Sequence, residues 1–124
     1  MAVVIELRYD IRARITLVLT EEGGRKTPAV RGYRPQFYYS GRDWDALPEY
    51  IGVEQVEPGQ TFETYLHLLS PECHYGKVTS GMPFEWREGA RVVGQGVVLE
   101  LLELERAARE TLERDPNALE SCRE

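Results

Sequence analysis

The segment VVIELRYDIRARITLVL, residues 3–19, has an alternation that indicates β-structure. Its odd positions are all apolar or aromatic, whereas charged and polar residues fill most of the even ones. Because successive side chains of a strand point to opposite faces, this period of two predicts a half-buried strand. One straight strand of this length would span roughly 56 Å. That exceeds a small domain, so we expect a bend or break near Asp10.

Further along the chain, similar segments predict an all-β domain. Aromatic and β-branched residues are enriched in four stretches, residues 34–40, 61–69, 83–87 and 91–101. Glu88 and Gly89 separate the last two stretches, which is a hairpin signal with a positive φ expected at the glycine. Glycines and prolines recur at intervals typical of a sandwich or barrel, so we expect no helix within residues 11–101.

The end of the chain changes to a helical pattern. Residues 102–114 are mostly strong helix formers, and apolar residues recur at spacings of three and four. Pro116 would end this helix. We therefore predict a β domain over residues 1–102, followed by a short amphipathic helix and tail over residues 103–124. The mixed charges of its polar face favour packing on the domain over membrane binding.

The bulk properties limit the classes of function. The chain has 124 residues and a net charge of −6, which argues against holding nucleic acid mainly through a positive field. Its two cysteines, Cys73 and Cys122, lie far apart and form no disulfide framework, which fits a reducing compartment. The apolar run at the N-terminus is too short for a signal peptide or membrane span, so we expect a cytoplasmic protein.

The segment EEGGRKTPAVRGYRPQF, residues 21–37, contains glycines and Lys26-Thr27, as a phosphate-binding loop does. A P-loop requires glycine directly before the lysine and a helix directly after the loop. Here Arg25 separates Gly24 from Lys26, and Pro28 follows. The segment therefore does not predict a nucleotide site, and we expect neither GTP nor any other cofactor.

Four segments in order resemble the C-terminal domain of bacterial elongation factor Tu. LVLTEEGGRKTPAVRGYRPQF, residues 17–37, is similar to the family pattern S-x-x-E-G-G-R-H-T-P-x-x-x-G-Y-R-P-Q-F. GVEQVEPGQ (52–60), LLSP (68–71) and REGARVVGQGVV (87–98) resemble its G-V-E-x-V-x-P-G-D, L-I-x-P and R-E-G-G-R-T-V-G-A-G-V-V. The resemblance implies a closed six-stranded antiparallel β-barrel. In the elongation factor a second barrel and a GTPase domain precede it, and neither fits into this chain.

The resemblance also implies contact surfaces for aminoacyl-tRNA, for the GTPase domain and for the nucleotide exchange factor. The tRNA face would include Arg25, Lys26, Gln36, Glu88 and Gly89. Lys26 replaces the histidine of the family pattern, and Ser70 stands where the family has a basic or imidazole side chain. The loop after the aromatic strand has become SGRDWDALPEY, residues 40–50, and its new carboxylates would repel phosphate.

These observations leave two functions open. The first is a non-catalytic module that binds a translation-factor protein, either a translation GTPase or a factor that recognises this barrel. The second is a small module that binds tRNA or other RNA. The candidate protein-interface residues lie in the altered loop and in the long segment SPECHYGKVTSGMP, residues 70–83; they are Trp44, Tyr50, Cys73, His74 and Tyr75.

The pair Cys73-His74, with His67 nearby, also suggests a metal site or a catalytic thiol. Adjacent residues do not easily face one ion, and no further ligand set is visible in the sequence. We therefore predict no metal site and no enzymatic activity, since no set of nucleophile, base and oxyanion donors can be assembled.

Overall fold

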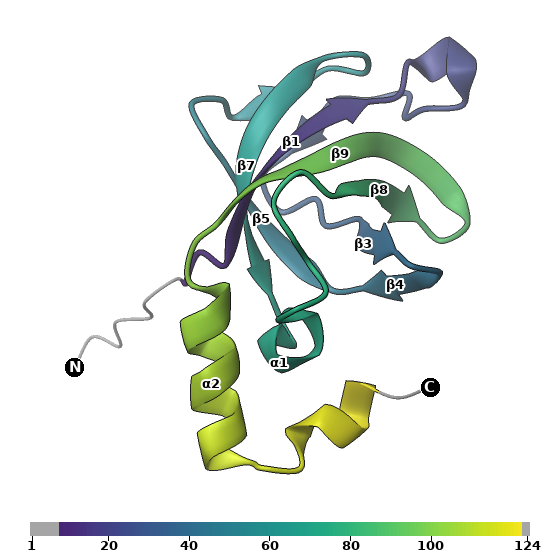
Figure 1. Ribbon diagram of the computed structural model, residues 1–124. Helices are drawn as coiled ribbons and strands as arrows, with labels where there is room; N and C mark the ends of the chain where they lie inside the picture. The colour runs from purple at the N-terminus through teal and green to yellow at the C-terminus, as the bar shows by residue number, and fades with distance from the viewer. Residues whose placement is uncertain (1–7, 123–124) are drawn as a thin grey trace, which may run out of the picture.

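The computed structural model describes residues 8–122, which form a curled antiparallel sheet with helices at one end (Figure 1). The strands are β1 (Ile11–Leu17), β2 (Ala29–Val30), β3 (Gln36–Tyr39), β4 (Arg42–Trp44), β5 (Ala46–Tyr50), β6 (Gln55–Val56), β7 (Thr61–Leu68), β8 (Pro83–Glu88) and β9 (Arg91–Leu101). The helices are α1 (Pro71–His74) and α2 (Leu104–Arg114), with 3-10 turns η1 (Thr20–Glu22) and η2 (Ala118–Cys122).

Strand β1 lies near the middle of the main sheet, between β7 and β9. Its buried residues alternate as the sequence predicts, with Ile11, Ala13 and Ile15 fully buried. The strand begins just after Asp10, where we expected a bend or break in the segment of residues 3–19; residues 3–7 of that segment lie outside the described residues. The buried Asp10 carboxylate accepts hydrogen bonds from Arg8 and from the Leu68 backbone, which compensates for its burial.

The sheet is an open half-barrel and not the closed six-stranded barrel that we predicted. Seven strands pair in the order β4-β3-β8-β9-β1-β7-β5, and β2 pairs with β6 in a separate small sheet. The edge strands β4 and β5 are not paired with each other. Only Asp45 separates them in the chain, so they follow one another end to end and cannot run side by side. Pro48 in β5 also lacks the N–H that a further ladder would use.

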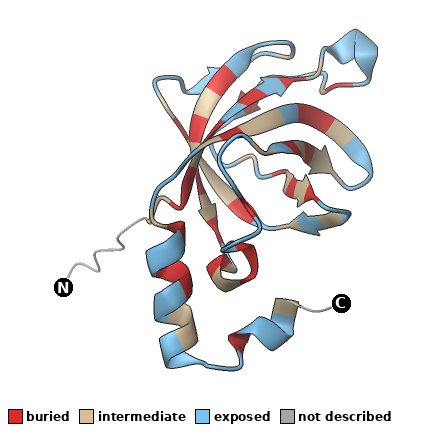
Figure 2. Cartoon of the chain, in the orientation of Figure 1, coloured by how far each residue is buried: buried red, intermediate tan, exposed pale blue. Residues whose placement is uncertain are grey.

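The core is packed inside the curl, where buried residues recur along the strands (Figure 2). Trp86 and Phe84 on β8 face Gly94 and Gly96 of the neighbouring strand β9. A Cβ atom on Gly96 would come 2.3 Å from the Phe84 ring, so glycine is required there for the ring to lie against the strand. The β8–β9 hairpin forms as predicted, with φ of 57° at Gly89.

The helical segments agree with the sequence at the C-terminus and differ from it inside the sheet region. Helix α2 spans Leu104–Arg114, where a helix was predicted, and buries Leu104, Ala107 and Ala108. The expectation of no helix within residues 11–101 is wrong, because α1 forms in the long segment after β7, with Pro71 at its first turn. Residues 8–122 contain no helix with the length and apolar character needed to cross a membrane.

Candidate functional site

Arg25, Tyr33 and Glu88 meet at one end of the half-barrel and form the Arg25 cluster. The Arg25 guanidinium lies 3.9 Å from the centre of the Tyr33 ring and 2.8 Å from Glu88 Oε1. Tyr33 donates its hydroxyl to the same carboxylate oxygen. Turn η1 and its C-capping Gly23, with φ of 98°, lead the chain into this contact. The Glu88 carboxylate therefore neutralises the charge of Arg25 and accepts a hydrogen bond from the Tyr33 hydroxyl.

These contacts lower the pKa of Glu88 and raise the pKa of Tyr33. The hydrogen bond from Tyr33, followed by the contacts with Arg25, lowers the pKa of Glu88 below its ordinary value. Burial and the hydrogen bond to Glu88 raise the pKa of Tyr33. At neutral pH the carboxylate is thus charged and the phenol is protonated, which favours the arrangement seen.

The residues expected on an RNA face lie near this cluster, and Arg25, Gln36 and Glu88 among them use their side chains for contacts within the chain. Gly89 follows Glu88 in the hairpin turn, and Gln36 pairs with Arg87 across β3 and β8. The Gln36 amide donates to Asp45 Oδ1 at 3.0 Å. Lys26 is exposed. The five residues therefore lie at one end, with Arg25 and Gln36 already engaged by carboxylates and Lys26 exposed beside Arg25.

A second cation–aromatic contact, which we call the Trp44 pocket, lies beside the helices. The Arg42 guanidinium is 3.9 Å from the centre of the Trp44 ring and donates to the carbonyl of Cys122. A cavity of about 230 Å³ lies here, lined by Tyr39, Ser40, Arg42, Trp44, Lys77 and Cys122. No carboxylate of residues 8–122 lies within ion-pair distance of Arg42 or Lys77. Within residues 8–122, the two cations of this pocket therefore have no carboxylate partner.

Three of the five interface candidates are buried, which corrects their expected place on the surface. Tyr50 is 7% exposed and packs edge-on against Phe62, 5.0 Å between ring centres. Cys73 and His74 are also buried, because α1 turns them inward under the helical end. Trp44 is partly buried, and Tyr75 is 43% exposed.

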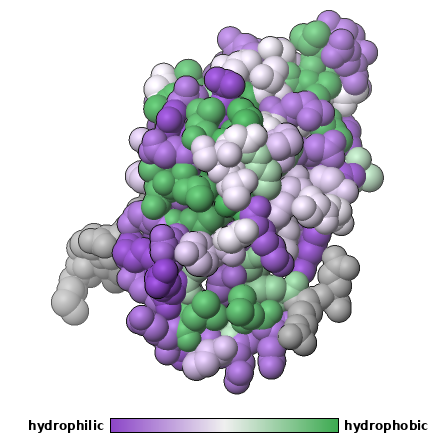
Figure 3. All heavy atoms as spheres, in the orientation of Figure 1, coloured by the Kyte–Doolittle hydropathy of each residue, from purple (hydrophilic) through white to green (hydrophobic). Residues whose placement is uncertain are grey.

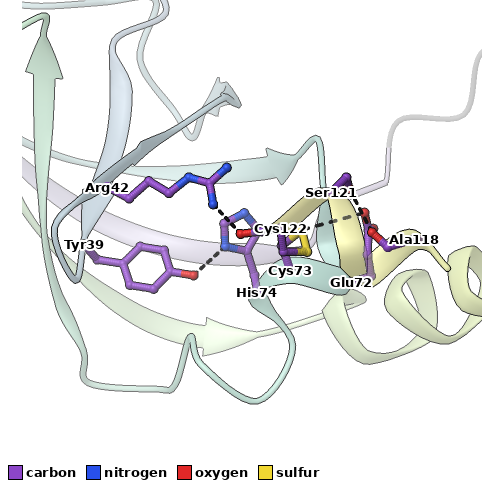
Figure 4. Close-up of a disulfide and its surroundings, with 8 residues drawn as sticks. All are labelled: Tyr39, Arg42, Glu72, Cys73, His74, Ala118, Ser121 and Cys122. Atoms are coloured by element: carbon purple, nitrogen blue, oxygen red, sulfur yellow. Dashed lines mark hydrogen bonds between the residues drawn. A yellow bond between two sulfur atoms is a disulfide. The ribbon is translucent and has the colours of Figure 1, made fainter. Parts of the chain in front are cut away.

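His74 packs between Tyr39 and Trp44, so it contributes to the structure of the pocket wall. Its Nδ1 lies 2.6 Å from the Tyr39 hydroxyl (Figure 4). Its ring centre is 4.5 Å from that of Trp44. Burial, with the nearby charges of Lys77 and Arg42, lowers the pKa of His74 to about 4. The imidazole is therefore neutral at pH 7, as its apolar surroundings require.

The expectation that both cysteines are reduced differs from the structure, in which Cys73 and Cys122 form a disulfide. Their Cα atoms are 5.4 Å apart although 49 positions separate them in the sequence. Helix α2 and the turn after it carry the chain back, so that η2 lies against α1 (Figure 4). The distance along the sequence gave no sign of this contact, because it depends on where α2 packs.

The fold and these surfaces define a small antiparallel β domain of the half-barrel type with a helical end. Residues 4–102 match the family described as the Elongation factor Tu C-terminal domain, which covers most of the chain. The chain therefore belongs to this family of non-catalytic β-barrel domains, as the sequence resemblance predicted. The family places it among translation-factor-like modules.

Sequence reasoning missed several residues that shape these surfaces. Tyr33 was visible in the GYRPQF motif, but its contact with Glu88 spans 55 positions. Asp45 was noted only as a repulsive charge, whereas it accepts the Gln36 amide. Arg42 precedes Trp44 by two positions in a strand, a spacing that puts both side chains on one face and could have suggested their stacking.

Proposed function

We propose that this chain is a non-catalytic docking module that binds a translation GTPase through its helical end, and that it binds no GTP itself. The Trp44 pocket carries the proposal, because it combines an aromatic ring with two cations that no carboxylate of the described residues neutralises. Aromatic residues and arginine are the residues most enriched at the centres of protein interfaces.

The distribution of exposed apolar residues also supports the helical end as the docking surface. Of the eight large apolar side chains with at least 38% exposure among the described residues, five lie in or beside the helices and three, Leu19, Val30 and Val53, lie elsewhere. The five are Leu69, Tyr75, Leu101, Leu102 and Leu119. Figure 3 shows apolar side chains gathered in patches among hydrophilic ones on the face that it presents. Apolar patches with a polar surround are typical of protein interaction sites.

Calorimetry with a purified translation GTPase would test this proposal. We expect Trp44→Ala to weaken binding by about 2 kcal/mol, roughly 30-fold, as for a central interface aromatic. Tyr75→Ala removes an exposed side chain and should weaken binding without affecting the fold. Val53→Ala, an exposed apolar residue away from the helices, is the matched control. Equal affinities of all three variants, or no complex with the wild type, would contradict the proposal.

RNA binding is the second candidate function, and one observation favours it. Arg25, Gln36, Glu88 and Gly89 lie together at one end, as an RNA face of the family type would need. Arginine and backbone groups there could contact phosphate and ribose hydroxyls. Against it stand the carboxylates of Glu88 and Asp45, which already bind Arg25 and Gln36.

A further inference from the structure

Cys73, Cys122 and Glu72 bring three potential metal-ligand atoms together at the contact between α1 and η2. These atoms all lie within 4.8 Å of one another. Glu72 Oε1 is 3.9 Å from Cys73 Sγ, while Glu72 Oε2 is buried and has no hydrogen-bond partner among the described residues. A buried carboxylate oxygen without a partner is costly, which suggests that another group satisfies it in some state of the protein.

The geometry is close to that of a tetrahedral zinc site. With Zn–S near 2.3 Å and Zn–O near 2.0 Å, tetrahedral angles place a sulfur and an oxygen ligand roughly 3.5 Å apart. The 3.9 Å between Glu72 Oε1 and Cys73 Sγ is similar. Two sulfur ligands of zinc are roughly 3.8 Å apart. Once the disulfide is broken, a movement of η2 of about 2 Å would therefore complete the set.

We propose that reduction of the Cys73–Cys122 disulfide creates a zinc site formed by the two thiolates and the Glu72 carboxylate, with water in the fourth position. A dithiol supplies two electrons and two protons and is itself oxidised to a disulfide. A phosphine supplies the two electrons and becomes the phosphine oxide, while one water molecule provides the oxygen atom and the two protons. Zinc binding then displaces both protons, because the thiolate is the ligand form.

The donor set favours zinc over harder cations. Thiolates select soft or borderline metals, whereas magnesium and calcium prefer a full set of oxygen ligands. His74 is not part of the set, since the ligand atoms that cluster here among the described residues come from Glu72, Cys73 and Cys122. The metal would replace the disulfide as the link between α1 and η2, so the C-terminal turn keeps its position in both redox states.

Metal titration of the full chain under anaerobic conditions would test the site, after reduction with a phosphine that is then removed. We expect one equivalent of Co²⁺ to give thiolate charge-transfer and tetrahedral ligand-field absorption, and one equivalent of Zn²⁺ to abolish both. The oxidised protein should bind neither ion. Cys122→Ser should lose most of the charge-transfer absorption. We choose Cys122 because it is only partly buried, so the fold tolerates its replacement better than that of the buried Cys73.

Glu72→Gln tests the carboxylate ligand. It should retain the thiolate absorption but weaken zinc binding by at least about 10-fold to 100-fold. Loss of a residue that only hydrogen-bonds to a metal ligand already has an effect of this size. Glu120→Gln, an exposed residue in η2 that removes the same charge, should bind zinc like the wild type. Absence of stoichiometric binding by the reduced wild type would overturn the proposal. Unchanged binding by Cys122→Ser, or equal effects of Glu72→Gln and Glu120→Gln, would overturn it as well.

Discussion

The two ends of the half-barrel use the same contact with opposite electrostatic results. In the Arg25 cluster and in the Trp44 pocket, an arginine guanidinium lies 3.9 Å from the centre of an aromatic ring. Glu88 neutralises Arg25, whereas the acceptor for Arg42 is a backbone carbonyl. Stacking alone therefore does not indicate an anion site, and the remaining partner of the arginine decides whether charge is available to a ligand.

The disulfide links α1 to η2 at the helical end, and its removal should have the largest effect on stability. Cys122→Ser should lower the free energy of unfolding by about 2–4 kcal/mol under oxidising conditions, because the unfolded chain loses a long cross-linked loop. Urea unfolding of both proteins would measure this. In reductant without metal the difference should vanish. Identical unfolding midpoints of the oxidised proteins would show that the bond does not restrict the unfolded chain.

If Arg25 loses its ion pair with Glu88, the Arg25 cluster should resemble the Trp44 pocket in having an arginine without a carboxylate partner. Glu88→Gln keeps the size of the side chain but removes its charge, so Arg25 becomes available to phosphate. We expect affinity for tRNA at low salt to rise about tenfold, with roughly 0.9 added to the salt slope for one more phosphate contact. Glu85→Gln, on the same strand and without an ion pair among the described residues, is the control for net charge. A rise of equal size in both variants would attribute the effect to long-range charge alone.

The same ion pair should have a small effect on stability that depends on pH. The pKa of Glu88 is lowered in the folded state, so its charged form stabilises the fold above its ordinary pKa of 4.5. This contribution is lost as the pH falls through the lower folded pKa. Because the side chains are partly exposed, Glu88→Gln should cost less than about 1 kcal/mol at pH 7 and nearly nothing at pH 2. An equal cost at both pH values would mean that charge is not the cause.

Features that depend on residues close together in the sequence could be predicted. Features that depend on contacts between distant parts of the chain could not. The alternation of β1, the β8–β9 hairpin and helix α2 each follow from residues close together in the sequence. The open sheet depends on the single residue between β4 and β5, and the disulfide depends on how α2 returns the chain. The family resemblance put Arg25 and Glu88 on one face, but only the fold shows that they form an ion pair and cancel each other's charge.

A salt titration of tRNA binding tests the central claim, that this module docks on protein and not on RNA. We predict poor tRNA binding by the wild type already at low salt, with little change when Arg25 and Lys26 are both replaced by alanine. An RNA face would behave differently, since each neutralised phosphate releases roughly 0.9 of a counterion and the double variant would flatten the slope by up to about two units. Tight tRNA binding by the wild type at physiological salt, lost in the Arg25→Ala/Lys26→Ala variant, would contradict the account.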